Sequence, residues 1–292
     1  MQTGIVIKAL NGYYYVQQMT AVIVCKLRGR LKKERYSLTV GDRVQYEILS
    51  EDTGIIEAIL PRKNLLQRPL VANIDQVILT CAAAAPDPHP LLLDRFLVLA
   101  EYSGLEKILI CINKADLSDL KEMEEFFRVY ADMGYEVLFV SAKAAQGIDA
   151  LKEHLQGCIS VFAGPSGVGK STLLNALDAK LNLETGAISE KIKRGKHTTR
   201  LAQLLPFGED GFVVDTPGFS ATEFLFLSER ELAAYFKEFR PFAGKCRYAT
   251  CIHDHEPQCA VKTAVAEGTI TQQRYDSYCN ILNEIRTQKR SF

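Results

Sequence analysis

A chain of 292 residues is too long for one ordinary hydrophobic core and predicts two or three domains. Its composition, 47% hydrophobic and 24% charged with no apolar run long enough to span a bilayer, excludes a helical membrane protein and predicts a soluble one. The net charge of zero hides an asymmetry, because residues 1–68 carry 11 Lys plus Arg against 6 Asp plus Glu. Eight scattered cysteines and no export or lipidation signal favour the reducing cytoplasm.

The first 68 residues contain β-rich runs separated by turn residues, with no helical pattern between them. Such a series predicts a small barrel, most simply an OB-fold, and its positive charge favours binding of a polyanion such as RNA. The basic stretch RGRLKKER also fits a solvated hairpin or loop. The expected strands are 4–10, 13–18, 21–27, 42–49 and 54–60.

From residue 69 to 225, strand-like apolar runs alternate with helical stretches, which predicts an α/β domain with a mostly parallel sheet. After that the strands stop, so residues 226–292 are expected to form a mainly helical domain. In it, SERELAAYFKEF is typical of a capped helix, and residues 270–286 predict another.

Two short motifs predict recognition of guanine. Asn113, Lys114 and Asp116 form an NKxD motif after a strand, where the aspartate can accept hydrogen bonds from the guanine N1–H and 2-amino groups. Adenine lacks that amino group, so the motif predicts GTP in preference to ATP. A triplet after the next strand is expected to back the base from the other side: Ser141, Ala142 and Lys143.

The segment GPSGVGKS matches the phosphate-loop pattern GxxxxGK[ST], between an apolar strand and a helix-forming stretch. Glycines let backbone N–H groups approach phosphate oxygens, and the following helix adds its positive end. Lys170 is expected to reach the β- and γ-phosphates, and Ser171 to bind Mg²⁺. The predicted nucleotide-binding residues here are Gly164, Pro165, Ser166, Gly167, Val168, Gly169, Lys170, Ser171 and Thr172.

The DTPG stretch completes the expected phosphate site. Its Asp215 would hold Mg²⁺ through water, and the Gly218 N–H would contact the γ-phosphate. Between the two segments, GKHTTR offers Thr198 and Thr199, one of which is expected to bind Mg²⁺ and to release it after hydrolysis. Spacing does not decide between them; we favour Thr199.

The order of these motifs is unusual. In ordinary small GTPases the phosphate loop comes first and NKxD and SAK come last, whereas here NKxD and SAK precede the phosphate loop. Because ligand contacts lie at strand ends along one edge of a sheet, joining the old termini and cutting elsewhere preserves the site. We therefore predict a circularly permuted P-loop GTPase domain. Its DTPG segment leads directly into the C-terminal domain, so a change at the γ-phosphate is expected to move that domain.

The segment CRYATCIHDHEPQC predicts a metal site. Three thiolates and one imidazole close a tetrahedral Zn²⁺ site with no open position, which favours a structural role over a catalytic one. His255 is an alternative ligand, and reduced cysteines in a helical loop are the competing interpretation. The candidate ligands are Cys246, Cys251, His253 and Cys259.

Taken together, the chain resembles the circularly permuted ribosome-biogenesis GTPases called ribosome small subunit-dependent GTPase A. The resemblance covers essentially the whole chain and is carried by TVGDRV, the permuted order, GPSGVGKS, GKHTT, DTPGF and the Cys/His cluster. It implies a factor that binds the small ribosomal subunit and its 16S rRNA late in assembly and hydrolyses GTP with stimulation by that subunit. It also implies that His253 is the zinc ligand. The family commonly has GRHTT where this chain has GKHTT, which leaves His197 and both threonines in place.

The catalytic group for hydrolysis is less evident. Ras-like enzymes place a glutamine after DxxG to orient the attacking water, but here that residue is Phe219, which cannot. We expect slow intrinsic hydrolysis, with help from His197 or from the bound ribosome; His197 also fits a residue that orders the switch or contacts RNA. The candidate catalytic residues are Lys170, His197 and Thr199.

Two other classes of function compete with this hypothesis. One is an RNA-binding chaperone for which GTP is only a structural ligand, against which the intact phosphate and Mg²⁺ residues argue. The other is a regulatory GTPase with a non-ribosomal target such as a membrane transporter, which the basic barrel disfavours. We expect GTP or GDP, Mg²⁺ and one Zn²⁺ as ligands, no membrane partner, and a monomer, because nothing in the sequence demands a dimer.

Overall fold

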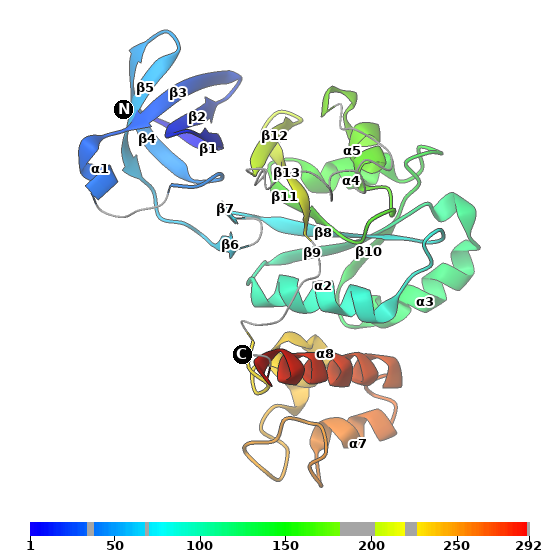
Figure 1. Cartoon of the computed structure of the whole chain (residues 1–292). Helices are drawn as coiled ribbons and strands as arrows, with labels where there is room; N and C mark the ends of the chain where they lie inside the picture. The colour runs from blue at the N-terminus through cyan, green and yellow to red at the C-terminus, as the bar shows by residue number, and fades with distance from the viewer. Residues whose placement is uncertain (34–37, 68–69, 182–201, 220–226, 291–292) are drawn as a thin grey trace.

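The computed structural model describes residues 1–33, 38–67, 70–181, 202–219 and 227–290. An N-terminal barrel is followed by a six-stranded sheet with helices on both faces, and a C-terminal helical region lies beneath that unit (Figure 1). The predicted fold class is confirmed, whereas the boundaries after residues 68 and 225 stay predictions. None of the helices in these described ranges is long and apolar enough to cross a membrane.

The barrel closes in the strand order β1-β2-β3-β5-β4, with β1 paired to β4. Side chains alternate between its inside and outside, so that Val6, Val16, Val44 and Ile56 are all 0% exposed. The five expected strands are therefore present. Their bounds are β1 (Gln2–Leu10), β2 (Tyr13–Gln18), β3 (Ala21–Leu27), β4 (Arg43–Ser50) and β5 (Thr53–Ile59).

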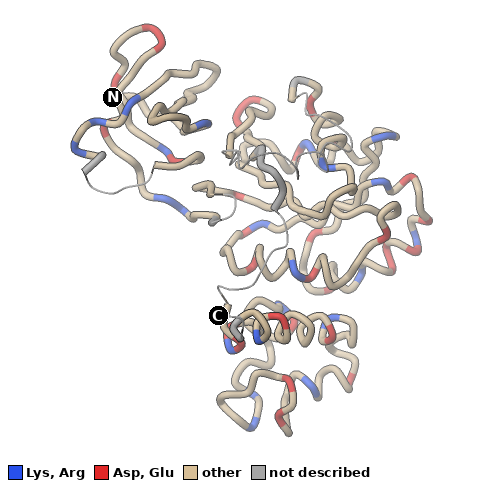
Figure 2. Tube along the Cα trace, viewed as in Figure 1, with Lys and Arg blue, Asp and Glu red and all other residues tan. Residues whose placement is uncertain are grey.

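Part of the basic RGRLKKER stretch has a structural role. It contains a short helix, α1 (Gly29–Lys33), so the loop interpretation is wrong for these residues. Arg28 Nη1 lies 2.5 Å from Glu57 Oε1, and Arg30 Nη2 donates to the Glu57 carbonyl oxygen at 2.9 Å. Because Glu57 is only 2% exposed, both cations balance a buried carboxylate. Figure 2 shows further Lys and Arg along the barrel and the segment that leaves it.

The central sheet has the order β10-β9-β8-β11-β13-β12, and every strand pair is parallel except β12 with β13. Strand β12 was not expected from the sequence; it contains Pro206, which an edge strand tolerates because one side of the strand needs no donor. The short hairpin β6–β7 was also missed. The bounds are β6 (Leu65–Gln67), β7 (Leu70–Ala72), β8 (Gln76–Ala82), β9 (Lys107–Asn113), β10 (Glu136–Phe139), β11 (Ile159–Ala163), β12 (Gln203–Phe207) and β13 (Gly211–Phe219).

Helices cover both faces of this sheet (Figure 1). Apolar residues of α4 and α5 pack on one face with Ile78 and Phe162, while α2 and α3 pack on the other with Val77 and Leu79. These four helices alternate with the sheet strands along the chain, as the sequence predicts. Their bounds are α2 (Pro90–Tyr102), α3 (Leu120–Asp132), α4 (Ile148–Leu155) and α5 (Lys170–Leu177), and a short 3₁₀ helix, η1 (Ala115–Leu117), precedes α3.

The topology agrees with the predicted permutation. Strand β11, which leads into the phosphate loop, lies at the centre of the sheet between β8 and β13, yet three other sheet strands precede it in the chain. The NKxD strand β9 and the SAK strand β10 form the edge beyond β8. The NKxD, SAK and phosphate-loop motifs therefore lie at the carboxyl ends of parallel strands, whereas DTPG forms the last part of β13 itself.

In the C-terminal region, α8 (Gln272–Arg290) confirms the expected last helix. The capped helix predicted over SERELAAYFKEF is present in part: Ser228 and Glu231 form the capping contact, but two short 3₁₀ helices follow in place of one continuous helix, η4 (Leu232–Tyr235) and η5 (Lys237–Phe242). They are separated by Phe236, whose extended backbone (φ −105°) interrupts the helix while its side chain is completely buried. Helix α7 (Ala260–Ala266) was not expected.

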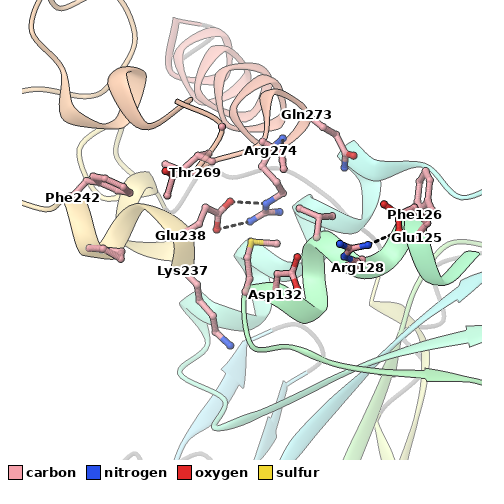
Figure 3. Close-up of a pocket in the computed structure, with 16 residues that line it drawn as sticks. Glu125, Phe126, Arg128, Asp132, Lys237, Glu238, Phe242, Thr269, Gln273 and Arg274 are labelled. Atoms are coloured by element: carbon pink, nitrogen blue, oxygen red, sulfur yellow. Dashed lines mark hydrogen bonds and ion pairs between the residues drawn. The ribbon is translucent and has the colours of Figure 1, made fainter. Parts of the chain in front are cut away.

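A cleft of about 740 Å³ lies between the C-terminal region and α3 (Figure 3).

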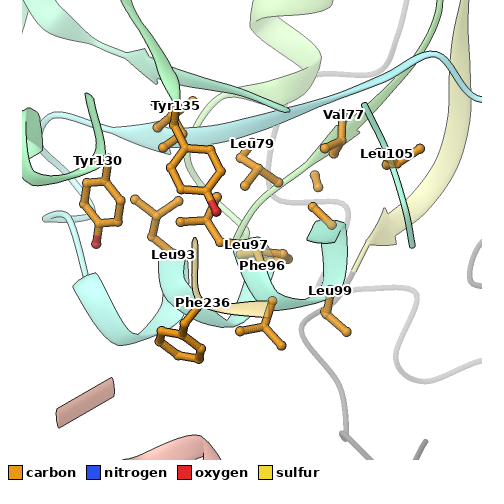
Figure 4. Close-up of a cluster of buried hydrophobic side chains, with 14 of the residues drawn as sticks. Val77, Leu79, Leu93, Phe96, Leu97, Leu99, Leu105, Tyr130, Tyr135 and Phe236 are labelled. Atoms are coloured by element: carbon orange, nitrogen blue, oxygen red, sulfur yellow. The ribbon is translucent and has the colours of Figure 1, made fainter. Parts of the chain in front are cut away.

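One apolar cluster joins the sheet to the C-terminal region. Leu93, Phe96 and Leu97 of α2 pack between Val77 on β8 and Phe236 from the C-terminal region (Figure 4). Burying an apolar side chain of this size contributes about 1.5–3 kcal/mol. The C-terminal region is therefore held against α2 by the same core that holds α2 against the sheet.

Candidate functional site

The phosphate loop connects β11 to α5 through a backbone that only glycine can supply. Gly164 has φ +143°, and a Cβ placed there would lie 2.1 Å from the Thr80 carbonyl oxygen on β8. Gly169 has φ +90°, and a Cβ there would lie 2.6 Å from Asn113 Nδ2. The glycines thus let the loop pass against two strand ends at once. The loop begins directly after the buried β11 and ends where α5 begins, as predicted.

Lys170 lies at the first position of α5 and folds back over the loop. Its Nζ donates to the carbonyl oxygens of Gly164 and Pro165, both at 2.7 Å. Burial lowers the pKa of Lys170 to about 8, because the charged ammonium is partly removed from water. A phosphate group is a stronger acceptor than these carbonyls, so the ammonium is prepared for an anion.

The guanine motif contacts the phosphate loop directly. Asn113 Nδ2 donates to the Val168 carbonyl oxygen at 2.9 Å, and its Oδ1 accepts from the Ala142 N–H at 3.1 Å. Lys114, in a left-handed conformation (φ +61°), donates from Nζ to the Gly167 carbonyl oxygen at 2.8 Å. These hydrogen bonds join the NKxD, SAK and phosphate-loop segments into one cradle.

The carboxylate expected to read guanine is held in place by the SAK serine. Ser141, which is 0% exposed, donates to Asp116 Oδ1 at 2.6 Å and accepts from the Ala144 N–H at 3.0 Å. Asp116 is therefore oriented before any ligand binds. Lys143 is exposed at the margin of the site. In the phosphate loop Ser166 is exposed, and in the first turn of α5 Thr172 is exposed and Ser171 is half-buried.

The Mg²⁺ residues are only partly described. Asp215 pairs with Gln203 along β13, one residue beyond Val214, which pairs with Val161 of β11. This register carries the DTPG backbone, including Gly218, alongside the strand that enters the phosphate loop. The two candidate Mg²⁺ threonines, Thr198 and Thr199, and the candidate catalytic residue His197 lie outside the described residues.

The sequence reasoning missed the loop between β8 and α2. Lys114 Nζ also donates to the Ala85 carbonyl oxygen. The Pro86 ring lies near Gly167: its Cδ atom is 3.8 Å from the position that a Cβ on Gly167 would take. His89 then caps α2, accepting from the Leu92 N–H at 3.4 Å. The run PDPHP after a buried strand signals an ordered turn, but nothing in it indicates contact with a loop some eighty residues later.

The cysteine and histidine cluster is assembled as the sequence predicts. Its four ligand atoms all lie within 4.8 Å of one another. His253 Nδ1 lies 3.5, 3.6 and 3.4 Å from the Sγ atoms of Cys246, Cys251 and Cys259. A tetrahedral zinc ion at its usual bond lengths separates its ligand atoms by about 3.6–3.8 Å, so these side chains fit the ion. The neighbouring His255 instead pairs with Asp254 and is not part of the cluster.

Helix α8 supports the loop that carries the candidate metal ligands. Tyr278 donates to the Ile252 carbonyl oxygen at 2.5 Å, and Tyr275 donates to the His253 carbonyl oxygen at 2.9 Å. Glu256 accepts from the Ile252 N–H at 2.9 Å. The loop that carries the ligands is thus tied to the helix that packs on α2.

Comparison with known proteins places this arrangement. The sequence profile described as RsgA GTPase matches residues 59–225, and the one described as RsgA N-terminal domain matches residues 3–56. The small ribosomal subunit biogenesis GTPase RsgA of Alkaliphilus metalliredigens is 46% identical over 99% of this chain and 100% of its own length. The protein of that name from Caldanaerobacter subterraneus is 42% identical over 98% of this chain and 97% of its own.

Solved structures agree. The crystal structure of YjeQ from Thermotoga maritima has a TM-score of 0.85 and 41% identity, and covers 97% of this chain and 98% of its own. That of YloQ, described as a circularly permuted GTPase, has a TM-score of 0.82 and 36% identity, and covers 98% and 95%. The chain belongs to the RsgA GTPase family, and it is a GTP hydrolase with a circularly permuted nucleotide-binding domain.

Proposed function

We propose that this protein hydrolyses GTP in late assembly of the small ribosomal subunit, where it binds the subunit through 16S rRNA and is stimulated by it. The observation that carries the proposal is the preassembled guanine and phosphate cradle, in a chain whose full-length relatives are named for small ribosomal subunit biogenesis. A cytoplasmic, monomeric factor made of domains 1–68, 69–225 and 226–292 agrees with this function.

The first experiment measures GTP turnover by the purified protein alone, with small subunits and with large subunits, using ATP as the control nucleotide. Strong stimulation by the small subunit alone, with ATP inert, is expected. Equal rates in all conditions would contradict a subunit-stimulated enzyme and would indicate another target. Binding of rRNA without turnover in any condition would indicate a nucleotide-dependent RNA chaperone.

Substrate contacts are proposed from the geometry of the cradle. Asp116 would bind guanine, Lys170 would neutralise charge on the β- and γ-phosphates, and the backbone N–H groups of the phosphate loop would orient them. Ser171, Asp215 and Thr199 would hold Mg²⁺, which neutralises phosphate charge when bound. Because Phe219 follows DTPG where Ras-like enzymes have a water-orienting glutamine, hydrolysis by the free protein is expected to be slow.

His197 is the proposed source of catalytic help within the chain. We expect His197→Ala to lose most of its subunit-stimulated turnover while its affinity for GTP is unchanged. Unchanged stimulated turnover would remove His197 from the mechanism and leave the ribosome as the source of the catalytic group. Thr198→Ala and Thr199→Ala, compared for Mg²⁺-dependent GTP binding, decide which threonine acts there.

The barrel offers basic and aromatic side chains suited to RNA. Lys26 lies over the ring of the exposed Tyr13, 5.0 Å from its centre, and Lys8 lies over Tyr15 at 5.6 Å. The exposed Tyr13 can stack on a base while the lysines contact phosphates. Binding to 16S rRNA is expected to weaken steeply with rising salt, and Lys26→Ala to reduce the slope by about one. A salt-independent interaction would contradict phosphate contacts.

Zinc is the proposed structural ion of the C-terminal region. The cluster supplies three thiolates and one imidazole at tetrahedral separations, with no position left for a reacting water. Burial lowers the pKa of His253, which favours the neutral imidazole that binds metal. When bound, the ion would crosslink the loop that α8 supports.

A further inference from the structure

The outward side of α2 is joined to the C-terminal region by ion pairs along its length. Acidic and basic residues of α2 at three positions each contact a charge from the C-terminal region. Glu101, near the end of the helix, lies 2.6 Å from Arg240 and 3.5 Å from Lys237. The two other pairs are Asp94 with Arg274 and Arg95 with Glu284.

Arg274 on α8 is the centre of this contact. It is 1% exposed, and its partner Asp94 is 0% exposed. Its guanidinium donates to Asp94 and also to Glu238, from Nε at 2.6 Å and from Nη2 at 3.2 Å (Figure 3). It also lies over the ring of Phe236, 4.6 Å from the centre, and Tyr130 of α3 donates to Asp94 at 3.0 Å. Burial alone would lower the pKa of Arg274, but the two carboxylates raise it, so the residue is charged.

The charges make separation of the two parts costly. If the C-terminal region moved away from α2, the buried contact of Arg274 with Asp94 would be broken and Asp94 would lose its cation. The apolar contact of Phe236 with α2 would be lost at the same time. Two independent sets of contacts therefore fix the same interface.

The start of α2 is also joined to the nucleotide site through the loop that precedes it. It begins directly after the loop in which the Ala85 carbonyl oxygen accepts from Lys114, and Lys114 in turn contacts the phosphate loop. Leu97 and Val98 of the same helix are completely buried. Helix α2 and the loop before it thus connect the guanine motif to the buried Arg274.

We propose that α2 holds the C-terminal region and the GTPase domain as one rigid body in every nucleotide state, and that Asp94 and Arg274 are positioning residues. They set the orientation in which the metal-binding loop meets its partner. The consequence for stimulated turnover rests on the proposed function, whereas the rigid attachment does not. Movement of the C-terminal region with the γ-phosphate, which the motif order suggested, is then not expected.

Hydrogen exchange of the full chain tests the attachment. Amides of α2 and α8 are expected to show equal protection with GDP and with a non-hydrolysable GTP analogue. A nucleotide-dependent change of tenfold or more in α8, measured at identical pH and saturation, would overturn the rigid body. This result does not depend on any ribosomal partner.

Asp94→Asn tests the positioning role, because it keeps the shape of the side chain and removes its charge. We expect zinc content, GDP affinity and intrinsic turnover within twofold of the unsubstituted protein, but at least a tenfold loss of maximal small-subunit-stimulated turnover. Asp94→Glu, which restores the carboxylate, is expected to recover part of it. Arg128→Met, which removes an exposed cation of α3, is the matched control and should change nothing.

The outcomes separate the two proposals. Normal stimulation of Asp94→Asn would overturn the positioning role, whereas absence of stimulation in the unsubstituted protein would overturn the proposed function. If Asp94→Asn loses zinc or intrinsic turnover, the positioning role is tested instead at the less buried pair of Arg95 with Glu284. Arg95→Glu should lose stimulation by the small subunit, and the double variant Arg95→Glu with Glu284→Arg should regain it. Failure of that double variant to recover would count against positioning through α2.

Discussion

The N-terminal barrel and the C-terminal region are attached to the same sheet in different ways. The barrel closes a core of its own, in which Val6, Val16 and Tyr46 contact other barrel residues, and its Ile7 and Val40 also reach the cluster beneath the sheet. The buried residues of the C-terminal region, by contrast, belong to one cluster with α2 and the sheet. Whether a region's apolar side chains close on themselves therefore decides how independent it is.

Buried charges follow the same division. In the barrel, Asp42 is 0% exposed and is satisfied nearby by Arg62 and by the Thr39 N–H at 2.8 Å. In the C-terminal region, Arg274 pairs with Glu238 of the same region and also with Asp94 of α2, 180 positions away in the sequence. A buried charge with a local partner stabilises one region, whereas a partner in another region fixes how the two are oriented.

Removing a metal ligand gives the largest expected effect and shows whether the two regions unfold separately. Cys251→Ser leaves three ligands, and zinc binding supplies about 10–16 kcal/mol in small zinc peptides. We expect loss of bound zinc and of hydrogen-exchange protection in α7 and α8, while the barrel amides stay protected. His255→Ala, at an exposed neighbour outside the cluster, is the control. Loss of protection in the barrel as well would mean that the regions are not independent.

Arg274→Met tests the shared interface itself. The substitution leaves Asp94 buried without its cation and should lower the free energy of unfolding of α2 and α8 by about 3–5 kcal/mol. Native-state hydrogen exchange measures this region by region. The matched change Arg128→Met removes a pair whose side chains are 63% and 73% exposed, which should cost less than about 1 kcal/mol. Equal effects of the two variants would contradict a buried, oriented contact.

The nucleotide site lies on the sheet that both regions flank. Its affinity for GDP is expected to depend on pH through Lys170. Lys170 has a pKa lowered to about 8 in the free protein, and bound phosphates would raise it. Below pH 8 the Lys170 ammonium is already charged, so the affinity for GDP should not change with pH. Above pH 8 binding must take up a proton, and the affinity should fall by up to about tenfold per pH unit. Titration calorimetry measures this, with Lys170→Arg as the control for ionisation of guanine itself. An equal slope in both proteins would refute the assignment.

The smallest expected effect is on the stability of the barrel alone. Tyr46, 1% exposed, donates its hydroxyl hydrogen between Gln2 and Gln18, whose Oε1 atoms lie at 3.0 and 2.9 Å. Tyr46→Phe should lower barrel stability by about 1 kcal/mol and leave exchange in α8 unchanged. Tyr13→Phe, at an exposed position, is the control. A change in α8 would show that the barrel core is coupled to the C-terminal region.

Sequence alone determined the nucleotide motifs, the metal cluster, the fold class and most element positions. Phosphate loops, NKxD motifs and ligand spacings are short-range patterns, and each is tied to a local backbone requirement such as the glycines at 164 and 169. The five barrel strands were evident because alternation and turn residues repeat at short intervals.

Only the tertiary structure decided the partners of residues far apart in the chain. Asp94 and Arg274 look like ordinary charges on two helices, and nothing near either residue shows that both are buried. The same holds for the Ala85 carbonyl oxygen, which takes its role from Lys114, and for Phe236, which interrupts an expected helix because its ring is buried in the shared core. Local sequence specifies conformation and exposure on average, whereas packing against a distant element decides which polar group has its partner and which helix continues.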